Sequence, residues 1–100
     1  MPMAAKGYWI AHNVVHDAEA YKKYQAANAA PLAEYGGRFV VRGGQQINPE
    51  GSWNSRTVVI EFPSYADAVA CYESKSYKAA LALRIDIADG NLVIVEGYDP

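Results

Sequence analysis

Polar side chains that alternate with apolar ones in short segments are the first candidates for chemistry in this sequence. His12 could act as a general base, because an unperturbed histidine titrates at a pH of about 6.5. Arg38 and Arg42 could bind a carboxylate or another small anion through their forked donors. The pattern predicts a site in which His12 removes a proton from a substrate that Arg42 orients. A hydrogen-bonded histidine at an interface is the alternative for His12.

Two glutamates extend this candidate site. Glu61 is predicted to be catalytic and Glu96 to contact the ligand, because two neighbouring carboxylates raise the pKa of one of them, which could then donate a proton. The alternative is that Arg38 neutralises them by pairing with Glu61 across neighbouring strands. Three further members are predicted. Tyr8 is a secondary catalytic group and Thr57 contacts the ligand. Trp53 lies on a lid or on an arm to a partner subunit.

The charge balance and the residue counts argue against several other functions. Nine basic and eleven acidic side chains leave a formal net charge of -2, which argues against a nucleic-acid partner. Cys71 is the single cysteine, so an internal disulfide and a multi-cysteine metal site are excluded. His12 and His16 would lie roughly 13 Å apart along a strand, too far for a shared metal. No glycine-rich phosphate loop is found, and we predict neither a metal nor a cofactor.

The length and the hydrophobic content fit one buried core. Of 100 residues, 51% belong to the hydrophobic set, and we expect a single domain over residues 1–100. No apolar stretch approaches the roughly 20 residues of a membrane span. The N-terminal residues also lack the apolar stretch of a secretory signal. We therefore expect a cytoplasmic protein without a membrane partner.

The elements that must position the candidate residues follow from periodicity. Aromatic and β-branched stretches predict strands, and apolar residues spaced by three and four predict helices. The predicted elements are strands at 7–14, 38–42, 56–62 and 92–96, a helix from Ala18 to Tyr35 with a kink or break at Pro31, and a helix after Ser64 that is interrupted at 73–76 and continues to Arg84. Gly90 is expected to stop the helical pattern. This order is strand, helix, strand, strand, helix, strand, the ferredoxin-like α+β arrangement of a four-stranded antiparallel sheet with its helices on one face.

Alternation along the strands divides the sheet into two faces. The face predicted to pack under the helices is almost wholly apolar: Trp9, Ala11, Asn13, Phe39, Val41, Val58, Ile60, Phe62, Val93 and Val95. The open face mixes apolar and charged residues: Tyr8, Ile10, His12, Val14, Arg38, Val40, Arg42, Thr57, Val59, Glu61, Leu92, Ile94 and Glu96. A symmetric hairpin places Arg38 opposite Glu61 and Arg42 opposite Thr57, although a bulge would shift this register. The apolar part of the open face predicts a homodimer in which two sheets face each other.

Several successive motifs resemble a known family. GYWIAH, AYKKY, YGGRFVVRGG, VVIEFPSYADAVACY, SKSYKAALALR and LVIVEGYD are similar to the family called domain of unknown function 1330, over residues 7–99. That family is similar to the dimeric α/β-barrel superfamily, so the resemblance implies a homodimer of two ferredoxin-like sheets. The superfamily includes cofactor-independent monooxygenases, isomerases, haem-binding proteins and ligand sensors. The resemblance therefore implies a fold and an assembly, but no single reaction.

Two functions follow from these observations. The first is a homodimeric protein that binds a small anionic or aromatic molecule in a polar cavity between facing sheets, with cofactor-independent proton transfer or oxygenation as its chemistry if it is an enzyme. The second is a non-catalytic structural or interaction module whose polar sheet face only forms the dimer. Unpaired His12 and Arg42 in a cavity would favour the first, and mutual pairing of Arg38, Glu61 and Glu96 would favour the second.

Overall fold

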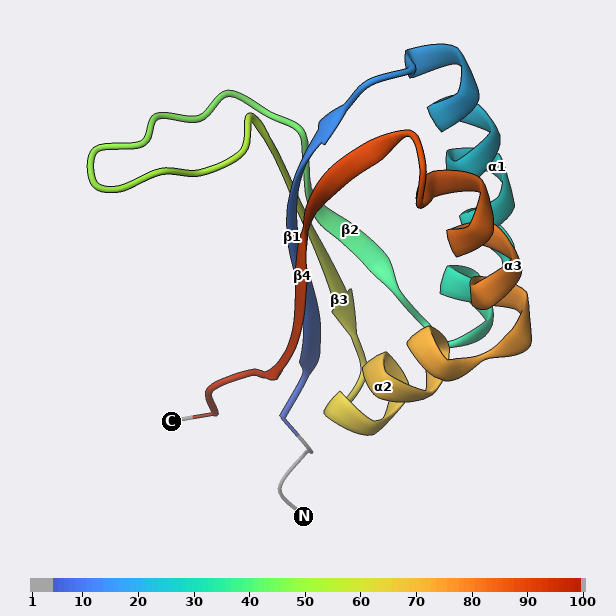
Figure 1. Cartoon of the computed structure of the whole chain (residues 1–100). Coiled ribbons are helices and arrows are strands. Elements are labelled where there is room, and N and C mark those ends of the chain that lie inside the picture. The colour runs from blue at the N-terminus through green and yellow to red at the C-terminus, as the bar shows by residue number, and fades with distance from the viewer. Residues whose placement is uncertain (1–4, 100) are drawn as a thin grey trace.

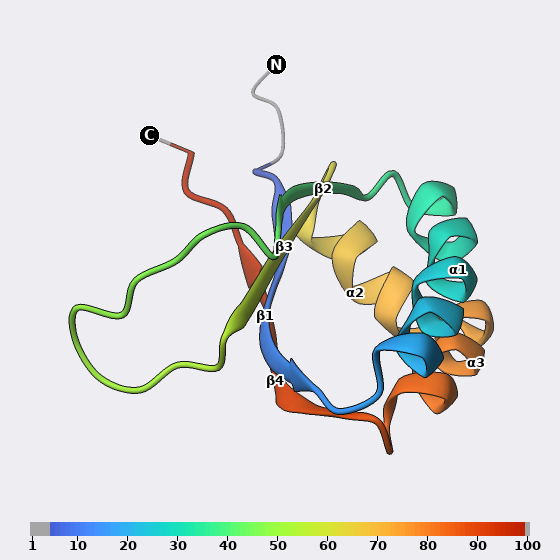
Figure 2. The same cartoon turned by 90° about the horizontal axis from the view of Figure 1, so that it is seen from above.

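The computed structural model describes residues 5–99 as one antiparallel sheet covered on one face by helices. In chain order the elements are β1 (Gly7–Val15), α1 (Ala18–Glu34), β2 (Arg38–Arg42), β3 (Arg56–Phe62), α2 (Tyr65–Glu73), α3 (Lys75–Arg84) and β4 (Ala88–Glu96). The strand order is β2-β3-β1-β4. Figures 1 and 2 show all three helices on the same side of the sheet and the β2–β3 loop extending from the other side. The predicted ferredoxin-like α+β fold is confirmed.

Short polar side chains start the helices at the predicted places. Asp17 accepts a hydrogen bond from the Ala20 N–H at 3.0 Å, as an N-cap does. Ser64 caps α2 in the same way, and Ser74 both ends α2 and caps α3. α1 runs through Pro31 as one helix, so the predicted break does not occur. The interruption of the second helix near residue 74 is confirmed.

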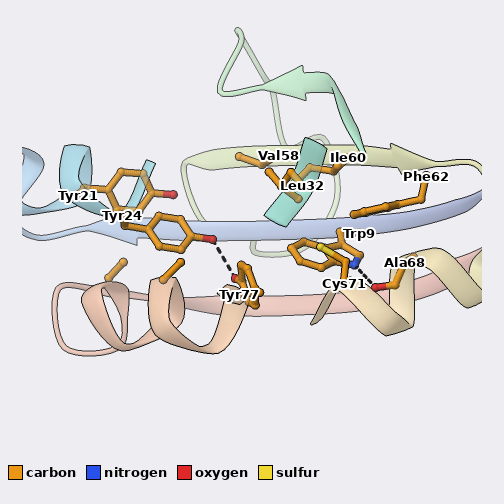
Figure 3. Packing of buried hydrophobic residues seen from close by; sticks show 12 residues of the cluster. Trp9, Tyr21, Tyr24, Leu32, Val58, Ile60, Phe62, Ala68, Cys71 and Tyr77 are labelled. Carbon is orange, nitrogen blue, oxygen red and sulfur yellow. Dashed lines mark hydrogen bonds between the residues drawn. The ribbon is translucent and has the colours of Figure 1, made fainter. Parts of the chain in front are cut away.

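The core lies between the sheet and the helices and is built around Trp9. The indole of Trp9 is 2% exposed, and its Nε1 donates to the Ala68 carbonyl oxygen at 2.8 Å (Figure 3). Its ring centre lies 5.2 Å from that of Phe62 and 4.9 Å from that of Tyr77. The hydroxyls of Tyr24 and Tyr77 are 2.9 Å apart and join α1 to α3. Tertiary packing therefore fixes the helix layer on β1 and β3.

The last strand differs from its prediction in length and in orientation. β4 begins at Ala88 rather than at Leu92, and Gly90 lies inside it. Leu92 and Ile94 pack against the core, whereas Val93 is 51% exposed. The predicted faces of this strand were therefore wrong. Residues 92–95 are all apolar, so alternation could not choose between two registers, and a shift of one residue exchanges the faces.

A β-bulge changes the pairing of β2. Arg38 pairs with Glu61 as predicted, but the register shifts between Phe39 and Val41. Val41 then pairs with Val59, and Arg42 pairs with Val58 instead of Thr57. The bulge inserts one residue, so the side chains that follow it exchange faces. The predicted positions of Val41 and Arg42 were therefore wrong.

Gly90 leaves room for β1 to pass closely, and this closeness can be tested. A Cβ at residue 90 would overlap the His12 carbonyl oxygen and lie 2.7 Å from the Asn13 Cβ. Gly90→Ala is therefore expected to lower the free energy of unfolding by about 1–3 kcal/mol, measured by urea denaturation. Gly44→Ala is the control, because nothing lies within 4 Å of its Cβ position. Equal stability of the two variants would contradict the close approach.

Candidate functional site

One group of predicted residues meets at Glu61 on the open face. The Tyr8 hydroxyl donates to Glu61 Oε2 at 3.0 Å, and Arg38 Nε donates to Oε1 at 3.1 Å. Desolvation acts to raise the pKa of Glu61, but the hydrogen bonds from Tyr8 and Arg38 outweigh it and lower this pKa. The bond to the carboxylate in turn raises the pKa of the Tyr8 hydroxyl. Glu61 is thus held as a carboxylate, which is the neutralised arrangement given above as the alternative.

A second group surrounds His12 and holds the β2–β3 loop. The Trp53 ring stacks on the His12 ring with centres 3.8 Å apart. Trp53 Nε1 donates to Thr57 Oγ1 at 2.9 Å, and Thr57 Oγ1 donates to Gln46 Oε1 at 2.6 Å. His12, Thr57 and Trp53 therefore come together. Their contacts are with one another and with the loop.

The ring nitrogens of His12 have different surroundings. Nδ1 accepts a hydrogen bond from the Asn54 backbone N–H at 3.2 Å, so the proton of the neutral ring sits on Nε2. Nε2 lies 3.5 Å from the side-chain amide of Asn91. The unprotonated nitrogen, which a general base needs, is already used to hold the loop. This arrangement favours the structural alternative for His12.

Two predicted members are not on the open face. The Arg42 guanidinium lies 4.1 Å from the centre of the Phe39 ring, on the side of the sheet that carries the helices. Glu96 pairs with Gly7 and shares the orientation of Ile94, which packs on the core. The predicted pairing of Arg42 with Thr57 and the predicted placement of Glu96 beside Glu61 on the open face were therefore wrong. The β-bulge moves Arg42, and the register of β4 moves Glu96.

A pocket lies between the sheet and the helices. It has a volume of ≈ 40 Å³ and is open to solvent over part of its boundary. Its polar lining comes from all four strands and from α1 and α3, and it includes His12, Asn13, Tyr21, Tyr24, Asn28, Arg42, Arg56, Arg84 and Asn91. Trp9, Phe39 and Leu92 form part of its apolar wall. This pocket therefore lies on the helix side of the sheet, and we call it the inner pocket. A second pocket of ≈ 280 Å³ lies at the β2–β3 loop and is lined in part by Gln46, Trp53 and Thr57. The cavity predicted between two facing sheets needs a second subunit and stays a prediction.

Two polar atoms at the inner pocket are buried and have no partner among the described residues. They are Asn13 Oδ1 and Arg56 Nε, and their residues stand directly opposite each other on β1 and β3. Asn13 is 6% exposed, and its amide lies 3.5 Å from the Tyr21 hydroxyl. Turning that amide would leave Nδ2 without a partner instead of Oδ1. Buried polar groups are nearly always hydrogen-bonded, so such a pair indicates a site that accepts a polar molecule.

The inner pocket is positively charged. Arg42, Arg56 and Arg84 line it, and no aspartate or glutamate within residues 5–99 does. Arg84 lies 5.4 Å from the centre of the Tyr24 ring, and Arg56 lies 5.7 Å from that of Tyr21. Aromatic rings support these cations without neutralising them. Such an environment favours a negatively charged or electron-rich guest.

The sequence contained a signal for this pocket that our prediction did not use. Asn13 was the one polar residue in the set assigned to the covered face. Arg56 precedes Val58 and Ile60 at the same two-residue spacing, so it belongs to that face as well. A buried amide and an arginine in phase with core residues mark a polar site inside the fold. Asn28 and Arg84 could be placed there only once the helices had been docked on the sheet.

Comparison with known proteins identifies the family. A family model described as a domain of unknown function, DUF1330, matches residues 6–98. The chain belongs to this family. The match confirms the resemblance found in the motifs. No protein with curated annotation matches the chain significantly.

Solved structures share the fold of this DUF1330 protein at low sequence identity. A protein of unknown function from Rhodopseudomonas palustris, RPA0582, has a TM-score of 0.74 and 20% identity, with 96% of this chain and 85% of that chain covered. SnoaB from Streptomyces nogalater, a cofactor-independent oxygenase, has a TM-score of 0.64 and 12% identity, with 97% of each chain covered. A dimeric protein of unknown function with a ferredoxin-like fold from Bacteroides fragilis has a TM-score of 0.60 and 16% identity, covering 95% of this chain and 99% of that one.

Within residues 5–99, no three histidine, cysteine, aspartate or glutamate side chains are grouped as metal ligands would be. None of the helices in the same range is both long enough and apolar enough to span a membrane. Cys71 is buried, and burial raises the pKa of its thiol to about 12. Such a thiol is a poor nucleophile, as expected for a core residue.

Proposed function

We propose that this protein is a homodimer that binds a small organic molecule in the inner pocket. The observation that carries the proposal is the cross-strand pair Asn13 and Arg56, whose buried polar atoms lack partners in the described chain. A fold that leaves a buried donor or acceptor unsatisfied loses stability, and a ligand with matching groups restores it. Aromatic rings also line several sides of this partly open pocket, which suits a small planar guest that enters from the solvent.

The open face supports the homodimer. Val41, Val93 and Val95 are each more than a third exposed, although they lie on strands of the sheet. Figure 2 shows no helix on this side of the sheet, and the β2–β3 loop extends from it. That loop carries Ile47 at 86% exposure and Trp53 at 46%. Two facing sheets would bury this apolar surface, and each loop would reach the other subunit.

The two functions inferred from the sequence are thereby assigned to opposite faces. Arg38 and Tyr8 satisfy Glu61 on the open face, which is what a packed dimer interface requires. The inner pocket carries the unpaired polar groups, which an interaction module without a ligand would not need. Ligand binding in the inner pocket is therefore the function we propose first, and the open face forms the dimer in this proposal.

Cofactor-independent oxygenation of the bound molecule is the second candidate function. The fold that this chain shares with SnoaB favours it. Without a flavin or a metal, the electrons that reduce oxygen must come from the substrate, which becomes a better donor when it loses a proton. Cationic arginines beside the pocket would stabilise the anion that remains. Oxygen consumption in the presence of a bound phenol would support this activity.

Filling the inner pocket tests the proposed function. Ala11 lines the pocket from β1, and Ala11→Leu adds three carbon atoms to it. Small aromatic compounds are first tested for binding to the wild type by ligand-observed NMR. For those that bind, we expect the saturation-transfer signal to fall by at least about 90% in this variant, which corresponds to a tenfold loss of affinity. Ala26→Leu on the exposed side of α1 is the control and should bind normally. No binding to the wild type, or equal binding to both variants, would contradict the proposal.

A further inference from the structure

We infer that the inner pocket selects a small carboxylate, and that Arg56 is the residue that binds it. The inference rests on the proposed function, because it names the class of ligand for the same site. The surroundings of Arg56, the residue opposite it and the distribution of acidic residues each support the inference.

Among residues 5–99, Arg56 is held in place without a counter-ion. Its guanidinium lies over the ring of Tyr21, with a carbon-to-centre distance of 5.7 Å. Gly43, at a φ of 69°, lies so close that a Cβ there would overlap Arg56 Nη1. An aromatic ring and a glycine thus fix the position of the guanidinium, while its Nε stays buried without a partner. A donor positioned in this way is ready for an anion that arrives from outside the chain.

The residue opposite Arg56 is neutral. Asn13 is its register partner, where an aspartate of the same shape would form a cross-strand ion pair. The amide instead leaves the positive charge of Arg56 uncompensated and adds a second unpartnered polar atom. A carboxylate in the pocket would supply the missing charge. One of its oxygens could accept from Arg56 while the amide of Asn13 binds the same molecule.

No acidic residue of the described chain lines the inner pocket. The carboxylates in ion pairs are those of Glu61 with Arg38 and Lys6, Asp89 with His16, and Glu19 with Lys22. None of these acids lines the inner pocket. Arg42 and Arg84 add positive charge at the same place. The potential of the pocket therefore favours an anion over a neutral molecule of equal shape.

Benzoate and benzamide provide the test, because they share size and planarity and differ in charge. We expect the wild type to bind benzoate about tenfold more tightly than benzamide in calorimetric titrations at low salt, since a charge-assisted hydrogen bond is the stronger one. Arg56→Met should lose this preference and retain benzamide binding. Arg38→Met is the control, because Arg38 forms an ion pair with Glu61 on the open face. This variant should leave the affinities for benzoate and for benzamide unchanged.

Asn13→Asp provides a second variant with almost the same shape. Its carboxylate would pair with Arg56, so benzoate should bind at least about tenfold more weakly while the melting temperature stays equal or rises. This variant keeps the test decisive should Arg56→Met fail to fold. A melting temperature that is unchanged or higher also distinguishes lost anion binding from general unfolding.

The outcomes separate the inference from the proposed function. Equal affinity for benzoate and benzamide, with both lost in Ala11→Leu, would retain the ligand pocket and overturn carboxylate selection. A benzoate preference that survives both Arg56→Met and Asn13→Asp would overturn the role of Arg56. Binding of neither compound at millimolar concentration would overturn the inference and the proposed function together.

Discussion

Trp9→Ala is expected to lower the free energy of unfolding by about 3–5 kcal/mol, the largest loss of stability from any single change considered for this chain. The indole is 2% exposed and packs on the rings of Phe62, Tyr72 and Tyr77. Its Nε1 also donates to the Ala68 carbonyl, which would remain buried without that partner. Removing the ring therefore creates a cavity between the sheet and α2 and removes the side-chain hydrogen bond to the Ala68 carbonyl. Urea denaturation followed by far-UV circular dichroism measures the loss.

The other tryptophan of the chain is the matched control. Trp53 is 46% exposed and contacts His12 and Thr57 at the base of the β2–β3 loop. Trp53→Ala should cost no more than about 1 kcal/mol, because an exposed stacking contact and one hydrogen bond are lost without a cavity. Equal losses in the two variants would show that Trp9 is not the centre of the core.

Most of the fold could be predicted from the sequence, because local signals and long-range packing agree there. In β1 and β3 the polar residues His12, Thr57 and Glu61 all fall on one alternating set, so only the other set can form the buried face, and it contains Trp9, Ile60 and Phe62. Asp17 and Ser64 begin helices exactly where the helical period begins, and both act as caps. Such elements can be predicted from the sequence because secondary-structure propensity, capping residues and hydrophobic pattern agree.

Two strands could not be oriented in this way, for different physical reasons. In β4 four consecutive apolar residues from Leu92 to Val95 satisfy either face, and pairing with β1 decides between them. In β2 the bulge between Phe39 and Val41 depends on how the strand pairs with β3. Neither the face of β4 nor the bulge in β2 is encoded by residues within the strand itself. Both features therefore become apparent only in the assembled sheet.

The candidate site was predicted only in part, because the sequence did not determine the orientation of β2 and β4. The pairing of Arg38 with Glu61 is confirmed, because Arg38 precedes the bulge in β2. The positions of Arg42 and Glu96 depended on β2 and β4 and were wrong. The inner pocket was missed because it needs helices packed on the sheet, and because Asn13 was treated as an exception to an apolar pattern. Its polarity was in fact the informative feature.

Val93→Glu is expected to convert the proposed homodimer into a monomer. Val93 is 51% exposed in the single chain and pairs with Ile10 at the centre of the open face. A glutamate there stays hydrated in the monomer but would be buried without a counter-ion in the dimer. We expect a cost of roughly 3 kcal/mol or more, which weakens dimerisation by more than about a hundredfold. Sedimentation velocity at micromolar concentration distinguishes the two masses.

The same substitution also separates the observed β4 orientation from the one predicted by alternation. If Val93 lay under the helices, a buried glutamate would unfold the chain and no compact monomer would remain. Leu83→Glu is the matched control, because Leu83 is 44% exposed on α3, on the helix side of the molecule, and should leave the dimer intact. A folded monomer for Val93→Glu alone supports both the orientation and the interface. A wild-type chain that sediments as a monomer, or a Val93→Glu variant that remains dimeric, would contradict pairing through the open face.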